Sequence, residues 1–171
     1  MNAPQPPSSD AYRVLFLCTG NSARSILAEY LLRREAPGRF EAFSAGAHPR
    51  GRVHPIAIEV LRDVYGIDAS GARSKSWEEF RDRKFDFVIT VCDRARESCP
   101  IWPGRPVVAH WSEEDPDAPE IEDEEKRRRL MRSVAADLQR RIALFCALSP
   151  ESLKRLRAGD APLAERLIGL P

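Results

Sequence analysis

The clearest chemistry in the chain lies in residues 18–25, which read Cys-Thr-Gly-Asn-Ser-Ala-Arg-Ser. The apolar run 14–17 precedes them and predicts a buried strand, and helix-forming residues follow from Ile26. A loop between a strand and a helix directs backbone N–H groups and the positive end of the helix at one place. An oxyanion fits such a cradle, and the guanidinium fork of Arg24 can hold two of its oxygens.

The same positive field stabilises the thiolate of Cys18 and makes it a nucleophile at neutral pH. Ser25 could donate its hydroxyl to that sulfur, while Gly20 and Asn21 tolerate a tight, left-handed backbone. A cysteine and an arginine at this spacing are usually unrelated, but the full string after an apolar strand is much more specific. The predicted oxyanion-binding residues are Thr19, Gly20, Asn21, Ser22, Ala23, Arg24 and Ser25.

Two further cysteines, Cys92 and Cys99, bracket a polar segment directly after a predicted strand. Thiols at such positions can pass a disulfide along a chain of exchanges. On a helix their Cα atoms would be about 10 Å apart, whereas a disulfide requires less than about 7 Å, so the segment must unwind on oxidation. Two unrelated buried cysteines, or a zinc site with His110 and His48 or His54, are the alternatives, although the spacing typical of zinc ligands is absent.

An Asp-Pro pair, Asp115-Pro116, lies in an acidic stretch after the last predicted strand. A carboxyl group beside a bound oxyanion can protonate the oxygen that leaves. The alternative is an ordinary Asp-Pro turn in an acidic loop. Cys146 falls in a long predicted helix, where we expect it to serve only in packing.

The elements that must position these residues alternate between strands and helices. Strands are predicted at 14–17, 41–45, 85–91 and 106–109, and helices at 26–35, 55–65, 77–81 and 121–148, with further turns near 153–156 and 163–167. This order predicts one α/β domain with a four-stranded parallel sheet in a three-layer fold and a site at the carboxyl ends of the strands. The expected buried stripe of the long helix is Leu130, Val134, Leu138, Ile142 and Phe145.

Composition limits the partners and the compartment. A net charge of +1 gives no strong field toward nucleic acid or membrane, and no apolar run is long enough to span a bilayer. Four cysteines without a recognisable signal peptide favour the cytoplasm. We expect a disordered tail at 1–11, the domain at 12–148, and a helical extension at 149–171 that carries no readable chemistry. The basic run 126–129 is expected to be a solvated helix face.

The string 18–25, together with Ser44-Ala45-Gly46, resembles the low-molecular-weight protein tyrosine phosphatase superfamily, which includes thioredoxin-coupled arsenate reductases. The resemblance runs from about Arg13 to Leu148. It implies the three-layer fold of that superfamily, with Cys18 as nucleophile and Asp115 as general acid. It also implies that Ser44 supports Asn21.

The resemblance favours the reductase branch. Tyrosine phosphatases carry aromatic residues after the Asp-Pro pair, whereas Asp117 and Ala118 follow here. Cys92 and Cys99 match the resolving cysteines of the reductases, which implies arsenate reduction to arsenite for arsenic detoxification. Electrons would come from thioredoxin, with no tightly bound cofactor and no metal, and phosphate and sulfate would compete with arsenate. A phosphatase acting on phosphotyrosine or small phosphoesters, a thiol sensor without turnover, and another thiol donor remain open.

Two positions depart from relatives. Ala23 replaces a cysteine found in some of them, which should not stop the thiol relay. Some relatives bind potassium beside the loop through four residues, of which Asn21, Glu29 and Ser44 match three. The fourth position aligns with Lys75, whose ammonium could replace the cation, although a solvated surface lysine is an equal alternative.

Overall fold

The computed structural model describes residues 10–168 and contains one four-stranded sheet. Its strands are all parallel and lie in the order β2-β1-β3-β4. The strands are β1 (Tyr12–Cys18), β2 (Phe40–Gly46), β3 (Phe87–Thr90) and β4 (Val107–His110). The predicted α/β fold with a four-stranded parallel sheet is therefore confirmed, and β4 lies at an edge as the proline before it suggested.

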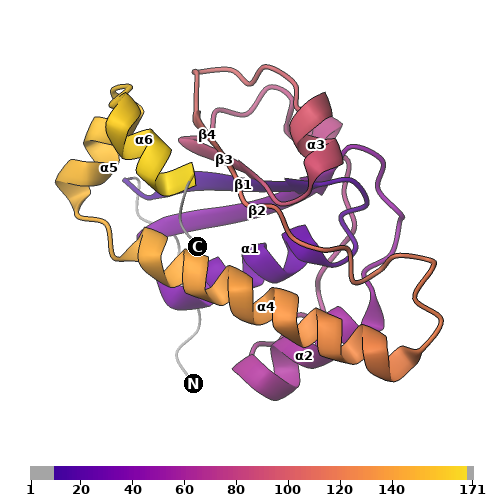
Figure 1. The fold of residues 1–171 in the computed structure, drawn as a ribbon. Coiled ribbons are helices and arrows are strands. Elements are labelled where there is room, and N and C mark those ends of the chain that lie inside the picture. The colour runs from indigo at the N-terminus through magenta and orange to yellow at the C-terminus, as the bar shows by residue number, and fades with distance from the viewer. Residues whose placement is uncertain (1–9, 169–171) are drawn as a thin grey trace.

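Helices cover both faces of this sheet (Figure 1). Helix α1 packs on β1, β2 and α4, and α2 packs beside α1 and α4, whereas α3 contacts β1 and β3 and α6 contacts β4. The helices are α1 (Arg24–Glu35), α2 (Pro55–Tyr65), the 3-10 turn η1 (Trp77–Phe80), α3 (Asp93–Ser98), α4 (Glu124–Cys146), α5 (Pro150–Arg157) and α6 (Ala161–Ile168). None of the helices in residues 10–168 combines the length and apolarity that crossing a bilayer requires.

Burial follows the apolar pattern of each element. Residues 14–17 and all of β3 are buried, as expected for strands covered on both faces. On α4 the predicted stripe is wrong at Leu130, which is only half-buried. Met131 takes its place, because one residue is about 100° of rotation and Met131 is the residue in phase with Val134 and Leu138. Helix α2 ends at Gly66, whose φ of 65° is the left-handed cap that the sequence predicts.

The two ends of the chain differ in what the structure describes. The expected disordered tail lies almost wholly in residues 1–9, outside the described residues. In the C-terminal extension, α5 places Leu153 and Leu156 in the core and Arg157 pairs with Asp86 at 2.9 Å. The extension therefore packs at the end of the sheet opposite the carboxyl ends of the strands (Figure 1). Cys18 ends β1 and Cys92 directly precedes α3, so both lie at the carboxyl ends.

Candidate active site

The loop 18–25 is shaped by the segment that follows β2. Its carbonyl groups accept backbone hydrogen bonds of 2.9–3.2 Å, which turns them away from the centre of the loop. Gly46 lies so close that a Cβ there would meet the Thr19 carbonyl at 2.6 Å, and Asn21 takes a left-handed φ of 42°. The bonds run from Ala47 to Cys18, His48 to Thr19, Arg50 to Gly20 and His54 to Ser22.

The Cys18 sulfur is held by two donors. Its Sγ lies 2.9 Å from Ser25 Oγ and accepts the Asn21 N–H at 3.2 Å. Because Ser25 Oγ already accepts from Asn21 Nδ2 at 2.8 Å, its proton is free for the sulfur. Both contacts hold the sulfur inside the loop, where it can act as the nucleophile.

A buried polar cluster supports the loop from behind. Asn21 Nδ2 donates to Ser44 Oγ at 3.0 Å, and the Ser44 hydroxyl donates to Glu29. The Lys75 ammonium lies 3.3 Å from Ser44 Oγ and 3.7 Å from Glu29 Oε2, and donates to the Arg73 carbonyl at 2.7 Å. Burial lowers the pKa of Lys75, and Glu29 opposes that shift. The alternative of a solvated surface lysine is wrong, because Lys75 is only 9% exposed.

If the Lys75 ammonium occupies the place of a cation, exchange of potassium for sodium should leave the wild-type melting temperature unchanged. Lys75→Asp removes that charge and adds an oxygen ligand beside Glu29, so its melting temperature should rise with potassium and much less with sodium. Lys84→Asp, a charge reversal at an exposed lysine, is the control. A wild-type protein that potassium stabilises selectively would contradict this role.

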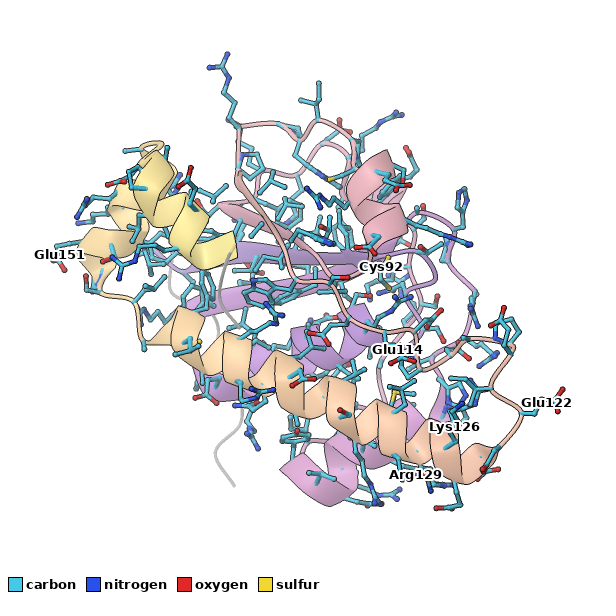
Figure 2. All side chains as sticks on the ribbon, in the orientation of Figure 1. Cys92, Glu114, Glu122, Lys126, Arg129 and Glu151 are labelled. Atoms are coloured by element: carbon cyan, nitrogen blue, oxygen red, sulfur yellow. The ribbon has the colours of Figure 1, made fainter. Side chains whose placement is uncertain are left out.

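The loop before α4 closes over the cleft with Asp115. Arg24 donates to the Glu113 carbonyl at 3.1 Å and pairs with Asp115 Oδ2 at 3.2 Å, so its guanidinium bridges the two loops. The cleft has a volume of about 590 Å³, and Cys18, Arg24, Cys92 and Asp115 all line it. Figure 2 shows Cys92 where α3 meets the sheet edge, near the loop that carries Glu114. These side chains can accept an oxyanion, attack it and protonate the oxygen that leaves.

The two ends of α3 separate Cys92 from Cys99. Cys92 is buried, accepts the Ala95 N–H at 3.4 Å, and lies 3.4 Å from Thr19 Oγ1. Cys99 is half-buried at the other end and is not among the residues that line the cleft. Burial raises the pKa of the Cys99 thiol, which disfavours its thiolate form where it lies. The structure brings Cys18 and Cys92 to one cleft and leaves Cys99 outside it.

Among the cleft residues that were not predicted from the sequence as site residues are Arg50, Asp117 and Glu113. Arg50 and Asp117 line the cleft and pair with each other at 2.8 Å. Glu113 lies over α4, where Arg141 is 3.4 Å away, and burial raises the pKa of Glu113 to about 7. No motif marks them, because their surroundings come from distant parts of the chain.

Glu113 should make stability depend on pH. The folded protein keeps a proton on this carboxyl up to about pH 7, whereas the unfolded chain releases it near 4.5. The folded state binds more protons in that window, so the free energy of unfolding should fall as pH rises from 4.5 to 7. The free energy of unfolding of Glu113→Gln should equal that of wild type near pH 5 and exceed it by roughly 1–2 kcal/mol at pH 8. Urea unfolding measures this, with Glu114→Gln, an exposed neighbour, as control; equal pH profiles for Glu113→Gln and wild type would refute it.

The zinc alternative finds no support in residues 10–168, where no three His, Cys, Asp or Glu side chains are grouped to hold a metal. His110 instead bonds Asp93 at 2.9 Å and Thr90 at 2.7 Å. Cys146 is half-buried at the end of α4, where burial raises its pKa to about 11, in keeping with a packing role. In the basic run, Lys126 and Arg129 are exposed at the start of α4 (Figure 2), but Arg127 turns inward to the carbonyl groups of Pro116 and Ala118.

Comparison with known proteins decides the family. The model of the low molecular weight phosphotyrosine protein phosphatase family matches residues 13–151. The chain belongs to this family. Among its relatives, the arsenate reductase of Halalkalibacterium halodurans is 35% identical over 132 residues, which cover 77% of this chain and 93% of the relative.

Solved structures agree with the family assignment. An arsenate reductase in the phosphate binding state superimposes with a TM-score of 0.66 and 30% identity, covering 80% of this chain and 97% of that one. The Corynebacterium glutamicum thioredoxin-dependent arsenate reductase gives a TM-score of 0.60 and 28% identity, covering 86% of this chain and 64% of that one. The resemblance of the sequence to this phosphatase superfamily is thereby confirmed.

Proposed function

We propose that the protein reduces arsenate to arsenite with Cys18 as nucleophile and Cys92 and Cys99 as resolving thiols. The observation that carries this proposal is that Cys18 and Cys92 line one cleft. Cys99 lies at the opposite end of α3 from Cys92. A phosphatase needs only the first thiol, because water can hydrolyse its intermediate. A reductase needs further thiols, because two electrons must come from sulfur.

In the first step Cys18 attacks arsenate held by the loop N–H groups and Arg24. A sulfur–arsenic bond forms, and an arsenic–oxygen bond breaks as Asp115 gives its proton to the departing oxygen, which leaves as water. Cys92 then attacks Cys18, so that a disulfide forms and arsenic leaves with the electron pair as arsenite. Attack by Cys99 moves the disulfide to Cys92–Cys99 and restores Cys18.

The last exchange requires α3 to unwind. Cys92 and Cys99 cap a formed helix, on which seven residues span about 10 Å, more than a disulfide allows. Opening this segment exposes the new disulfide, which a thioredoxin reduces. No tightly bound cofactor is required, and phosphate and sulfate should compete for the loop. Because the relay needs reduced thiols, we place it in the cytoplasm.

Support comes from the named arsenate reductases among the relatives and from the thioredoxin-dependent and phosphate-binding neighbours. The test is NADPH oxidation with arsenate, thioredoxin and thioredoxin reductase, with glutaredoxin and glutathione in a parallel reaction. Many turnovers of arsenite release per protein are expected. Fast hydrolysis of phosphotyrosine without arsenite release would favour a phosphatase, since Arg24 and Asp115 could act in that reaction too. A single oxidation of the thiols without turnover would favour a thiol sensor.

A further inference from the structure

Asp117 is a buried carboxylate that the reaction scheme above does not use. It follows Pro116 in the loop between β4 and α4 and is only 5% exposed. Its Oδ2 accepts the Ser22 hydroxyl at 2.6 Å and lies 2.8 Å from Arg50 Nη1. A carboxylate is rarely buried unless it is paired, so these partners hold Asp117 in one place.

The partners of Asp117 come from three separate parts of the chain. Ser22 belongs to residues 18–25, which we call the oxyanion loop, and Arg50 belongs to the segment after β2. Arg127 belongs to α4, and its Nη1 lies 3.8 Å from Asp117 Oδ1. His54 and Arg52 also lie within 3.7 Å, and burial lowers the pKa of His54 while Asp117 opposes that shift. Through these contacts Asp117 ties residues 113–118, which we call the acid loop, to the oxyanion loop.

The same residue also orients Asp115. The Asp117 N–H donates to Asp115 Oδ1 at 3.1 Å, and Arg50 bonds the Asp117 carbonyl at 2.8 Å while its other nitrogen lies 3.8 Å from Asp115 Oδ2. The carboxylate of Asp115 also pairs with Arg24, whose Nη2 lies 3.2 Å from Asp115 Oδ2. Asp115 is thus aimed at the guanidinium that would hold the oxyanion.

We propose that Asp117 is a positioning residue, which fastens the acid loop to the oxyanion loop so that Asp115 reaches the departing oxygen. This inference rests on the proposed function, in which that oxygen takes the proton of Asp115 and leaves as water while the Cys18–arsenic bond forms. In this scheme Asp117 neither gives nor takes the transferred proton and acts only through the position of Asp115. Geometry of this kind matters, since a displacement of about 1 Å can cost a reaction roughly a hundredfold in rate.

The experiment compares Asp117→Ala, Asp115→Ala and the double variant. The rate is arsenite formation in the first turnover, and affinity for inorganic phosphate is measured by protection of Cys18 from iodoacetamide. Asp117→Ala should slow the first turnover roughly 10- to 100-fold and change phosphate affinity by less than about threefold. The double variant should be no slower than Asp115→Ala alone, because Asp117 acts only through Asp115.

Asp123→Ala is the matched control. Asp123 is an exposed aspartate that caps α4 by accepting the Glu125 N–H at 2.8 Å, so its loss weakens the start of α4 without removing a residue that lines the cleft. If Asp117→Ala does not fold, Asp117→Asn replaces it, since the amide keeps an acceptor for Ser22. An additive double variant, or equal losses of rate and phosphate affinity, would overturn the proposal.

Hydrogen exchange separates this inference from the proposed function. With phosphate bound, Asp117→Ala should speed amide exchange across residues 112–120 about tenfold, whereas Asp123→Ala should not. If the wild-type protein forms no arsenite, the proposed function fails, and the exchange rates still decide whether Asp117 holds the acid loop. Unchanged exchange in that loop would overturn the inference whatever the protein reduces.

Discussion

Cys99→Ser is expected to release one arsenite per protein and then stop with a disulfide between Cys18 and Cys92. Both of these sulfurs line the cleft, so the first attack needs no help from Cys99. Without Cys99 nothing inside the protein removes the disulfide from Cys18, and multiple turnover should fall to background. Non-reducing peptide mapping by mass spectrometry after arsenate treatment reads the trapped bond.

Cys92→Ser should behave differently. Its oxyanion loop is untouched, so Cys18 still forms an adduct, but no arsenite should leave and any weak phosphatase activity should remain. Cys146→Ser is the control for removing a half-buried thiol, and its turnover should equal that of wild type. Full multiple-turnover reduction by the Cys92→Ser, Cys99→Ser double variant would refute the three-thiol relay.

Cys18→Ser should abolish both arsenate reduction and any phosphatase activity, by about 10⁴-fold or more. The substituted serine would meet the same two groups as the sulfur, Ser25 and the Asn21 N–H. A serine hydroxyl keeps its proton at neutral pH, so it is a far weaker nucleophile than a cysteine sulfur. The cradle itself stays intact, so phosphate should still bind, which isothermal titration measures.

The same variant identifies the reactive thiol. Wild type should lose one thiol quickly to iodoacetamide at neutral pH, and arsenate, phosphate or sulfate should slow that loss. The fast phase should be absent in Cys18→Ser. It should remain in Cys146→Ser, because burial raises the pKa of the Cys146 thiol to about 11 and that thiol reacts slowly at neutral pH. A fast phase that survives in Cys18→Ser would place the nucleophile elsewhere.

The sequence by itself determined the features that depend on short stretches of chain. Residues 14–35 contain strand, oxyanion loop and helix in succession, and a buried strand leading into such a loop needs no distant partner to be recognised. The cap at Gly66 and the edge position of β4 likewise follow from single residue types with restricted backbone chemistry. The placement of Cys92 beside the same cleft as Cys18 followed from parallel strands ending at one edge.

Only the tertiary structure decided which charged side chains surround the loop. Lys75 reaches Glu29 across 46 positions, a contact that the resemblance left open against a solvated surface lysine. Asp117 reaches Ser22 across 95 positions, and no pattern in the sequence marks that contact. The raised pKa of Glu113 arises in the same way, from burial against α4. Burial and pairing of charges are set by how separate elements pack, and that depends on the sum of many weak contacts rather than on any local rule.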